Sequence, residues 1–242
     1  MKLYLGRFFI IVFLLFLQFD SINLQKDFIS NINSPDKKYG YGFRVIYEMN
    51  VGAFTKEGTF ASAGGKLSEL KSLGIDVIWL MPIYKRGGGI NSPYSAAALK
   101  TTNPSYGQLK TEDLKNFVSS AHKLNMEILL DWVPNHTANN HPWLNLHPDY
   151  YAKDLHPFYG DVSQLNYENS NLRKAITYIL KFYVDQANID GYRCDSVSSP
   201  YILNDWTKTI PELKNYKSGK SFFFLGEADF TDASRLFGVG FD

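Results

Sequence analysis

Two patterns of apolar and polar positions alternate along this chain, and together they predict an α/β fold. Runs of continuous apolar residues, typical of strands buried on both faces, occupy 44–50, 76–82, 127–134, 189–195 and 222–228. Between them lie segments with apolar residues at helical spacing, at 64–74, 111–125, 171–187 and 202–216. Strand and helix therefore alternate, which indicates a parallel sheet, either in a closed barrel or in an open doubly wound fold.

Three further features refine this prediction. Pro211 is expected to break the helix at 202–216, because proline lacks the N–H that a helix interior needs. A sixth strand is expected at 236–242. No glycine-rich phosphate-binding motif follows the first strand, which argues against a nucleotide-binding sheet.

Polar side chains recur where the predicted strands end. They are Asp131 to His136 at the C-terminal end of the third strand, Asp195 at the end of the fourth and Glu227 at the end of the fifth. Active sites of (β/α)₈ barrels lie at this end of the strands. The long polar stretch that follows His136 predicts a small inserted subdomain over 137–168, above the same end of the sheet.

The segment GYRCD at 191–195 and the glutamate of GEAD at 226–229 are the chemically suggestive pair. Residues two apart on a strand point to the same side, so Arg193 and Asp195 should face together, and Tyr192 and Cys194 should face the helices. The Arg193 charge favours an ionised Asp195, as a nucleophile requires. On these fragments alone, an Arg–Asp pair of this kind is more often a plain salt bridge.

Glu227 ends the next predicted strand, after the apolar run FFFLG. Parallel strands lie about 4.8 Å apart, so the Asp195 and Glu227 carboxyl groups can approach the roughly 5–5.5 Å found in retaining glycosidases. The apolar surroundings predict a raised pKa for Glu227, which suits a general acid.

The N-terminus and the composition limit location and partners. Basic residues precede an apolar stretch at 8–19, which predicts a signal peptide over 1–24, then a linker over 25–40 and a secreted or periplasmic protein. The apolar stretch is shorter than the about 20 residues of a membrane-spanning helix, so no permanent anchor is expected. A net charge of +1 without a basic cluster argues against nucleic acid as a partner.

The order of DWVPNH (131–136), GYRCD (191–195) and GEAD (226–229) resembles the α-amylase family, glycoside hydrolase family 13. The segments SPY (92–94), NPSYG (103–107) and QLNYENSNLRKAI (164–176) extend the resemblance, which covers about 41–242. It implies a (β/α)₈ TIM-barrel catalytic domain and a retaining glycoside hydrolase that acts on α-glucans such as starch and maltooligosaccharides.

The resemblance also implies roles for individual residues. Asp195 would be the nucleophile, and Glu227 would be the general acid and then the base. Arg193 would orient Asp195 and keep it ionised. His136 would hydrogen-bond the sugar beside the scissile bond, and Tyr94 would stack on that sugar.

Two more positions follow from the same motifs. Asp131 would organise the rim of the barrel, and Asn135 matches a position that binds structural calcium in many members. Gln164 stands where some members have a calcium-binding Asp, and calcium takes six to eight oxygen ligands. We therefore expect no required cofactor, with calcium left open at Asn135.

The family's fourth motif, which supplies a third carboxylate after strand 7, has no counterpart here. We therefore expect an incomplete barrel of about six of the eight strands, as in a fragment of a longer gene product. The alternative is a catalytically inactive module that binds glucan or another partner. A metal-dependent barrel lyase or isomerase ranks last, because no ligand cluster is evident.

Overall fold

The computed structural model describes residues 44–87, 92–102, 111–153, 160–197, 200–228 and 233–242. The predicted signal peptide, the predicted linker and the NPSYG segment lie outside the described residues. No helix within the described ranges is long and apolar enough to cross a membrane.

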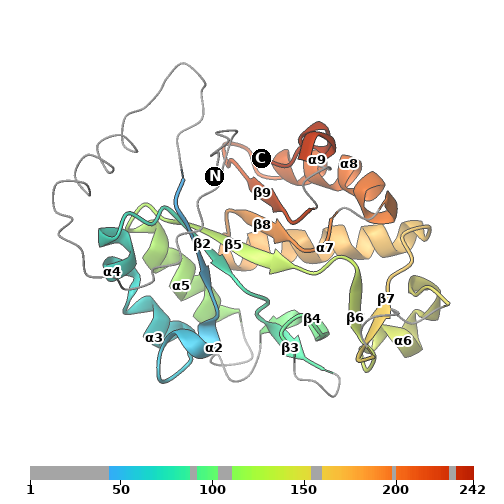
Figure 1. Cartoon of the computed structure of the whole chain (residues 1–242), viewed down its shortest axis with the longest axis horizontal. Coiled ribbons are helices and arrows are strands. Elements are labelled where there is room, and N and C mark those ends of the chain that lie inside the picture. Colours follow the sequence, from blue (N-terminus) through green and yellow to red (C-terminus); the bar gives the residue numbers. More distant parts are fainter. Residues whose placement is uncertain (1–43, 88–91, 103–110, 154–159, 198–199, 229–232) are drawn as a thin grey trace, which may run out of the picture.

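A parallel sheet organises the described part of the chain (Figure 1). Its strands follow in the order β1 (Ile46–Met49), β2 (Val77–Leu80), β5 (Glu127–Trp132), β8 (Gly191–Cys194) and β9 (Phe223–Gly226). Each strand pairs in parallel with the next one in this order. Spatial order thus equals chain order, as in a segment of a (β/α)₈ barrel, and the five strands predicted first are confirmed.

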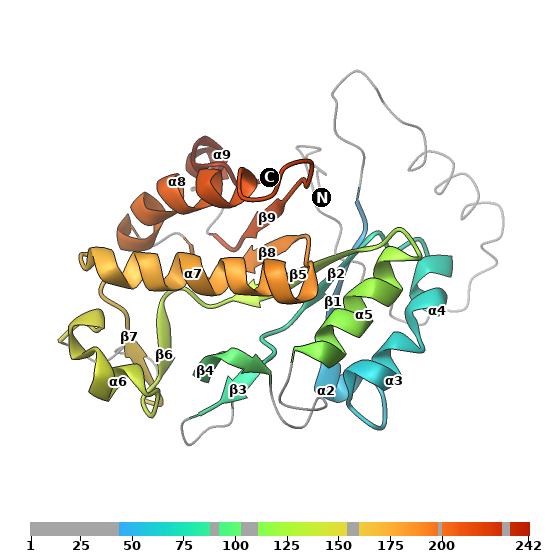
Figure 2. The same ribbon diagram turned by 180° about the vertical axis from the view of Figure 1, so that it is seen from behind.

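Helices cover one face of this sheet, and Figure 2 shows α5 and α7 in front of it. Tyr192 and Cys194 of β8 belong to the large apolar core on this face, and the Tyr192 hydroxyl donates to the Leu180 carbonyl of α7 at 2.6 Å. The prediction that these two side chains face the helix layer is therefore confirmed. The helices are α2 (Val51–Phe54), α3 (Phe60–Gly64), α4 (Leu67–Ser72), α5 (Glu112–His122), α7 (Ser170–Ala187), α8 (Pro200–Lys214) and α9 (Ala233–Val239).

Local sequence signals fix the ends of two of these helices. Thr59 and Ser62 form a reciprocal capping box at the start of α3. At α7 the Asn169 side chain accepts from the Asn171 N–H, and Asn188 ends the helix in the left-handed conformation, with φ of 57°. The chain then turns directly into β8, which carries the candidate site.

Two sequence predictions are wrong in this part of the fold. Helix α8 continues through Pro211, because this proline and the Thr207 carbonyl that loses its partner lie on the exposed side. The expected sixth strand at 236–242 is mostly helix α9, in which Leu236 and Val239 lie one turn apart and pack against the core. The described residues therefore contain five strands of the barrel rather than about six.

The opposite face of the sheet carries a second, smaller apolar cluster. It consists of Val77, Trp79, Leu129 and Phe223, with Ile46 and Leu225 packed against it. Arg193 projects from this face, because it alternates with Tyr192 and Cys194 along β8.

Two antiparallel excursions leave the C-terminal ends of β2 and β5 (Figure 1). The first is β3 (Tyr84–Arg86) paired with β4 (Ala96–Thr102). The second falls largely within the segment predicted as an inserted subdomain. It pairs β6 (His136–Ala138) with β7 (Val162–Gln164) around α6 (Trp143–Leu146) and the short 3₁₀ helix η2 (Pro148–Tyr150).

Candidate active site

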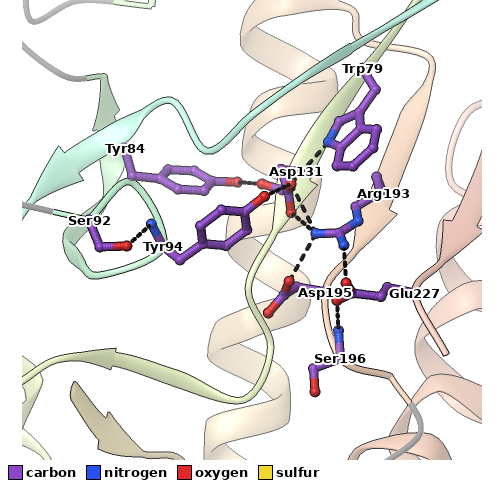
Figure 3. A network of polar contacts seen from close by, with 9 residues as sticks. All are labelled: Trp79, Tyr84, Ser92, Tyr94, Asp131, Arg193, Asp195, Ser196 and Glu227. Atoms are coloured by element: carbon purple, nitrogen blue, oxygen red, sulfur yellow. Dashed lines mark hydrogen bonds and ion pairs between the residues drawn. The ribbon is translucent and has the colours of Figure 1, made fainter. Parts of the chain in front are cut away.

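Four of the residues predicted from the sequence meet at the C-terminal ends of β5, β8 and β9, namely Asp131, Arg193, Asp195 and Glu227 (Figure 3). Asp131 and Arg193 are register partners on neighbouring strands. Asp195 comes directly after β8, and its N–H donates to the Trp132 carbonyl at 2.9 Å. Glu227 comes directly after β9, and its N–H donates to the Cys194 carbonyl at 2.9 Å. Continuation of the strand ladder therefore sets both carboxylates at one rim.

Arg193 connects three carboxylates in this rim. Its Nη1 lies 3.1 Å from both oxygens of Asp131 and 2.9 Å from Oδ1 of Asp195. Its Nη2 lies 2.9 Å from Oε1 of Glu227. The guanidinium is 7% exposed, and the three carboxylates raise its pKa against the opposing effect of burial. Arg193 therefore stays charged, and it is shared between Asp131 and the two predicted catalytic acids.

Asp131 lies at the buried end of this network. Its Oδ2 accepts from the indole Nε1 of Trp79 at 2.9 Å and from the hydroxyl of Tyr94 at 3.2 Å. Its backbone carbonyl accepts from the hydroxyl of Tyr84 at 2.9 Å. Burial raises the pKa of Asp131 to about 7, although Arg193 acts in the opposite direction. The structure thus places Asp131 where the resemblance implied, beneath the rim.

The two predicted catalytic carboxyl groups differ in pKa. Burial and the neighbouring Glu227 raise the pKa of Asp195 to about 6, although Arg193 acts to lower it. Glu227 is 52% exposed, and partial burial acts to raise its pKa. The Ser196 N–H, Asp195 and Arg193 outweigh that effect and lower the pKa of Glu227 below its ordinary value.

The predicted raised pKa of Glu227 is therefore wrong for the protein without substrate. The sequence prediction rested on the apolar run FFFLG, but the glutamate side chain leaves that core and reaches donors instead. Arg193 acts to lower the pKa of Asp195, as its position on the strand predicts, but burial and Glu227 outweigh this effect.

Ser196 is a site residue that the sequence analysis missed. Its backbone has φ of 47°, the left-handed region that side chains other than glycine and asparagine seldom adopt. In this conformation its N–H donates to Oε2 of Glu227 at 2.9 Å. Backbone strain of this kind often accompanies functional sites. No sequence signal marks it, because serine has no preference for this conformation.

Trp79 and Tyr84 were also missed, although a signal for Trp79 was present. A buried tryptophan usually needs an acceptor for its N–H, and Trp79 stands in the middle of an apolar predicted strand. The register of β2 with β5 pairs Trp79 with Leu129, two residues before Asp131 on the same face. Prediction of this contact required the strand pairing.

Tyr94 belongs to this network through its hydroxyl group. Its backbone N–H donates to the Ser92 hydroxyl oxygen at 3.2 Å, in the turn before β4. Burial and Asp131 raise the pKa of the Tyr94 hydroxyl, so it remains a neutral donor. The predicted stacking of Tyr94 on a sugar stays a prediction.

His136 and Asn135 lie at the start of the second excursion. His136 is buried in β6, and its Nδ1 lies 3.3 Å from Nδ2 of Asn135. Its predicted contact with sugar stays a prediction. In the part of the chain that the structure describes, no three His, Cys, Asp or Glu side chains gather as a metal site. Asn135 alone does not supply the oxygens that calcium needs, so its metal role also stays a prediction.

Fold and site together define a section of a (β/α)₈ barrel with a carboxylate pair at the C-terminal ends of its strands. The sequence profile of the family described as "Alpha amylase, catalytic domain" matches residues 52–159 and 145–224. The chain belongs to the α-amylase family.

Individual relatives agree with this assignment. The chain is 33% identical over 187 residues to malto-oligosyltrehalose trehalohydrolase of Deinococcus radiodurans, with 76% of this chain and 30% of the relative covered. It is 27% identical over 223 residues to alpha-amylase 3 of Dictyoglomus thermophilum, with 79% and 42% covered. The chain thus spans less than half the length of these relatives.

Solved structures show the same relation. A maltogenic alpha-amylase from Thermotoga neapolitana has a TM-score of 0.70 and 30% identity, over 76% of this chain and 46% of that one. An alpha-amylase from Geobacillus thermoleovorans, solved with acarbose, has a TM-score of 0.70 and 26% identity, over 82% and 50%. The fold class predicted from the sequence, a partial (β/α)₈ barrel, is confirmed.

Proposed function

We propose that this protein acts as a retaining glycoside hydrolase on α-glucans such as starch and maltooligosaccharides. The observation that supports it most is the sharing of Arg193 between Asp195 and Glu227, at 2.9 Å from each. Two carboxylates held by one guanidinium lie close together, and retaining enzymes need the shorter separation of roughly 5–5.5 Å. Family membership and relatives named as amylases and trehalohydrolases support the α-glucan substrate.

Each carboxylate has a defined part in this reaction. Asp195 attacks the anomeric carbon, and the bond to the leaving oxygen breaks as Glu227 donates a proton to it. The product is a glycosyl ester of Asp195. Glu227, now ionised, takes a proton from water, which attacks the same carbon and releases the sugar and the Asp195 carboxylate. Two inversions give net retention of the α configuration.

The pair must contain one proton when substrate binds. Asp195 titrates at about 6 and Glu227 below its ordinary value, so the pair contains a single proton between the two apparent values. That proton lies mostly on Asp195 in the free protein. Contact of Glu227 with the glycosidic oxygen, which accepts a hydrogen bond, would favour the reactive form, in which Asp195 is ionised and Glu227 is protonated.

Substitution of Glu227 tests this function against a matched control. Glu227→Gln should lower turnover of maltooligosaccharides by roughly 10²–10⁴-fold, because the general acid–base group is lost. Glu212 is 53% exposed and pairs with Lys181 at 2.7 Å, so it resembles Glu227 in exposure and pairing but lies outside the site. Glu212→Gln should leave turnover unchanged. Equal turnover in both variants would contradict the proposal.

The stereochemistry provides an independent test. Proton NMR of the first products should show the α-anomer before mutarotation. Initial release of the β-anomer would exclude the retaining mechanism. Glucan affinity kept by Glu227→Gln, with no turnover by the unmodified protein, would instead indicate a binding module. We further propose a secreted or periplasmic location, which the basic and apolar N-terminal segment supports.

A further inference from the structure

Trp79, on the sheet face that carries the smaller apolar cluster, contacts both Asp131 and Arg193 of the charged network (Figure 3). Its indole Nε1 donates to Oδ2 of Asp131 at 2.9 Å. The face of the same ring lies under the Arg193 guanidinium, with the Cζ atom 4.6 Å from the ring centroid. The residue is 9% exposed and belongs to the small apolar cluster on this face. One side chain thus binds an anion by its edge and a cation by its face.

We propose that Trp79 is a positioning residue, which fixes Asp131 and Arg193 so that the guanidinium reaches both Asp195 and Glu227. The proposal rests on the proposed function for its catalytic consequence, but the contacts themselves do not depend on it. Trp79 would act through Arg193, since its two contacts in the network are with Asp131 and Arg193.

The geometry explains why an indole suits this position. Arg193 faces three carboxylates, and it could shift toward any of them. The aromatic face below it restricts the plane in which the guanidinium lies, and a cation over a ring is itself favourable. The indole N–H meanwhile donates to Oδ2 of Asp131, and the same oxygen also accepts from Tyr94 and Arg193. Asp131 is therefore fixed as an acceptor on the far side of Arg193 from the cleavage site.

Other buried indoles do not have this arrangement. The Nε1 atoms of Trp132 and Trp206 are buried and have no hydrogen-bond partner among the described residues. Both side chains belong to the large core on the helix-covered face, where they contribute packing alone. Trp206 therefore offers a matched control, because Trp206→Phe removes a buried indole without removing an interaction at the site.

The first experiment needs no substrate and no turnover. In ¹H–¹⁵N spectra of the unmodified protein, the indole signal of Trp79 should shift with pH as Asp131 titrates, while the signals of Trp132 and Trp206 stay constant. Single Trp→Phe variants assign the signals. In Trp79→Phe the midpoint for Asp131, followed by ¹³C-labelled aspartate, should rise, because a donor to the carboxylate is lost. Trp206→Phe should leave that midpoint unchanged.

The second experiment measures the catalytic consequence. Trp79→Phe keeps a ring under Arg193 and removes the N–H, so kcat should fall roughly ten- to a hundredfold while KM changes little. Trp79→Leu removes the ring as well and should lower kcat further. A variant that only loosened packing would change stability without moving the Asp131 midpoint or separating kcat from KM.

The outcomes separate the two proposals. The positioning role would be overturned if the indole signal of Trp79 did not change with pH. It would also be overturned if the titration midpoint of Asp131 were equal in Trp79→Phe and Trp206→Phe. Absence of glucan hydrolysis by the unmodified protein would overturn the proposed function and would leave the spectroscopic result standing.

Discussion

Charged side chains lie at both ends of the parallel sheet, but the ratio of carboxylates to cationic partners differs between the two ends. At the N-terminal ends of the strands, each carboxylate contacts its own base, and the pairs are Lys71–Asp76 at 3.4 Å, Arg44–Glu127 at 2.7 Å and Lys220–Asp190 at 3.1 Å. His122 adds a second partner to Asp190 at 2.8 Å. At the C-terminal ends, Asp131, Asp195 and Glu227 share the single Arg193.

This difference agrees with the proposed function, in which charge is structural at one end of the strands and catalytic at the other. A carboxylate that has its own cation forms an ion pair, which helps to stabilise the packing of strand ends and helices. Three carboxylates around one cation cannot all be neutralised, so their proton affinities depend on one another. Perturbed and interdependent pKa values of this kind are typical of catalytic sites. Asp190 and Asp195 flank the same strand, β8, but Asp190 has Lys220 and His122 as partners, whereas Asp195 shares Arg193 with two other carboxylates.

The backbone shows the same contrast. Asn125 and Asn188 adopt positive φ just before β5 and β8, and asparagine tolerates this conformation well. Ser196, just after β8, adopts φ of 47° without that tolerance. Backbone strain is therefore present at the C-terminal rim, where the Ser196 N–H donates to Glu227. At the N-terminal rim the positive φ angles fall on asparagines, which tolerate them.

Removal of the shared cation should have the largest effect. Arg193→Met leaves Asp131 buried without its charged partner, which should lower the free energy of unfolding by about 3–5 kcal/mol. Arg44→Met removes an arginine from an exposed pair at the other end and should cost about 1 kcal/mol or less. Urea unfolding of both variants measures the difference. Equal costs would show that the two ends do not differ in this respect.

The pH dependence of turnover should follow the shared proton. Above about 6 the Asp195–Glu227 pair loses its last proton, so Glu227 has none to donate. We expect kcat/KM on a maltooligosaccharide to fall toward about tenfold per pH unit above that value. It should also fall at low pH, where Asp195 cannot be ionised. A rate that stays constant from pH 6 to well above 7 would refute the pair's titration as described here.

Relief of strain at Ser196 should have the smallest effect. Ser196→Gly removes the Cβ that opposes positive φ, a cost of about 1–2 kcal/mol, but glycine gains freedom in the unfolded chain. The net result should be a gain in unfolding free energy of up to about 1 kcal/mol. Asn125→Gly is the matched substitution at the other rim and should gain less. A larger gain from Asn125→Gly in urea unfolding would reverse the contrast.

Much of this arrangement could be predicted from the sequence because it depends on strand periodicity. Alternation along 191–195 placed Arg193 with Asp195 and turned Cys194 toward the helices. The order of apolar runs gave the five parallel strands. Motif order then identified the family, which no single residue could do.

What could not be predicted depends on contacts between elements. Trp79 meets Asp131 only because β2 and β5 pair in one particular register. The pKa of Glu227 is lowered, against the prediction, because its side chain contacts Arg193 and the backbone N–H of Ser196. The apolar content of 236–242 predicts a strand, whereas the spacing of Leu236 and Val239 suits the helix that packs there.

The proposed function requires Asp195 to be the nucleophile of a retaining glycosidase. A fluorinated α-glucosyl fluoride, which forms the glycosyl-enzyme quickly and releases it slowly, can trap the covalent ester on the protein. Mass spectrometry of the intact chain and of its peptides would then locate the sugar. We predict one fluorinated glucosyl adduct, on Asp195 within GYRCD. An adduct on another residue, or none on protein that binds the reagent, would contradict it.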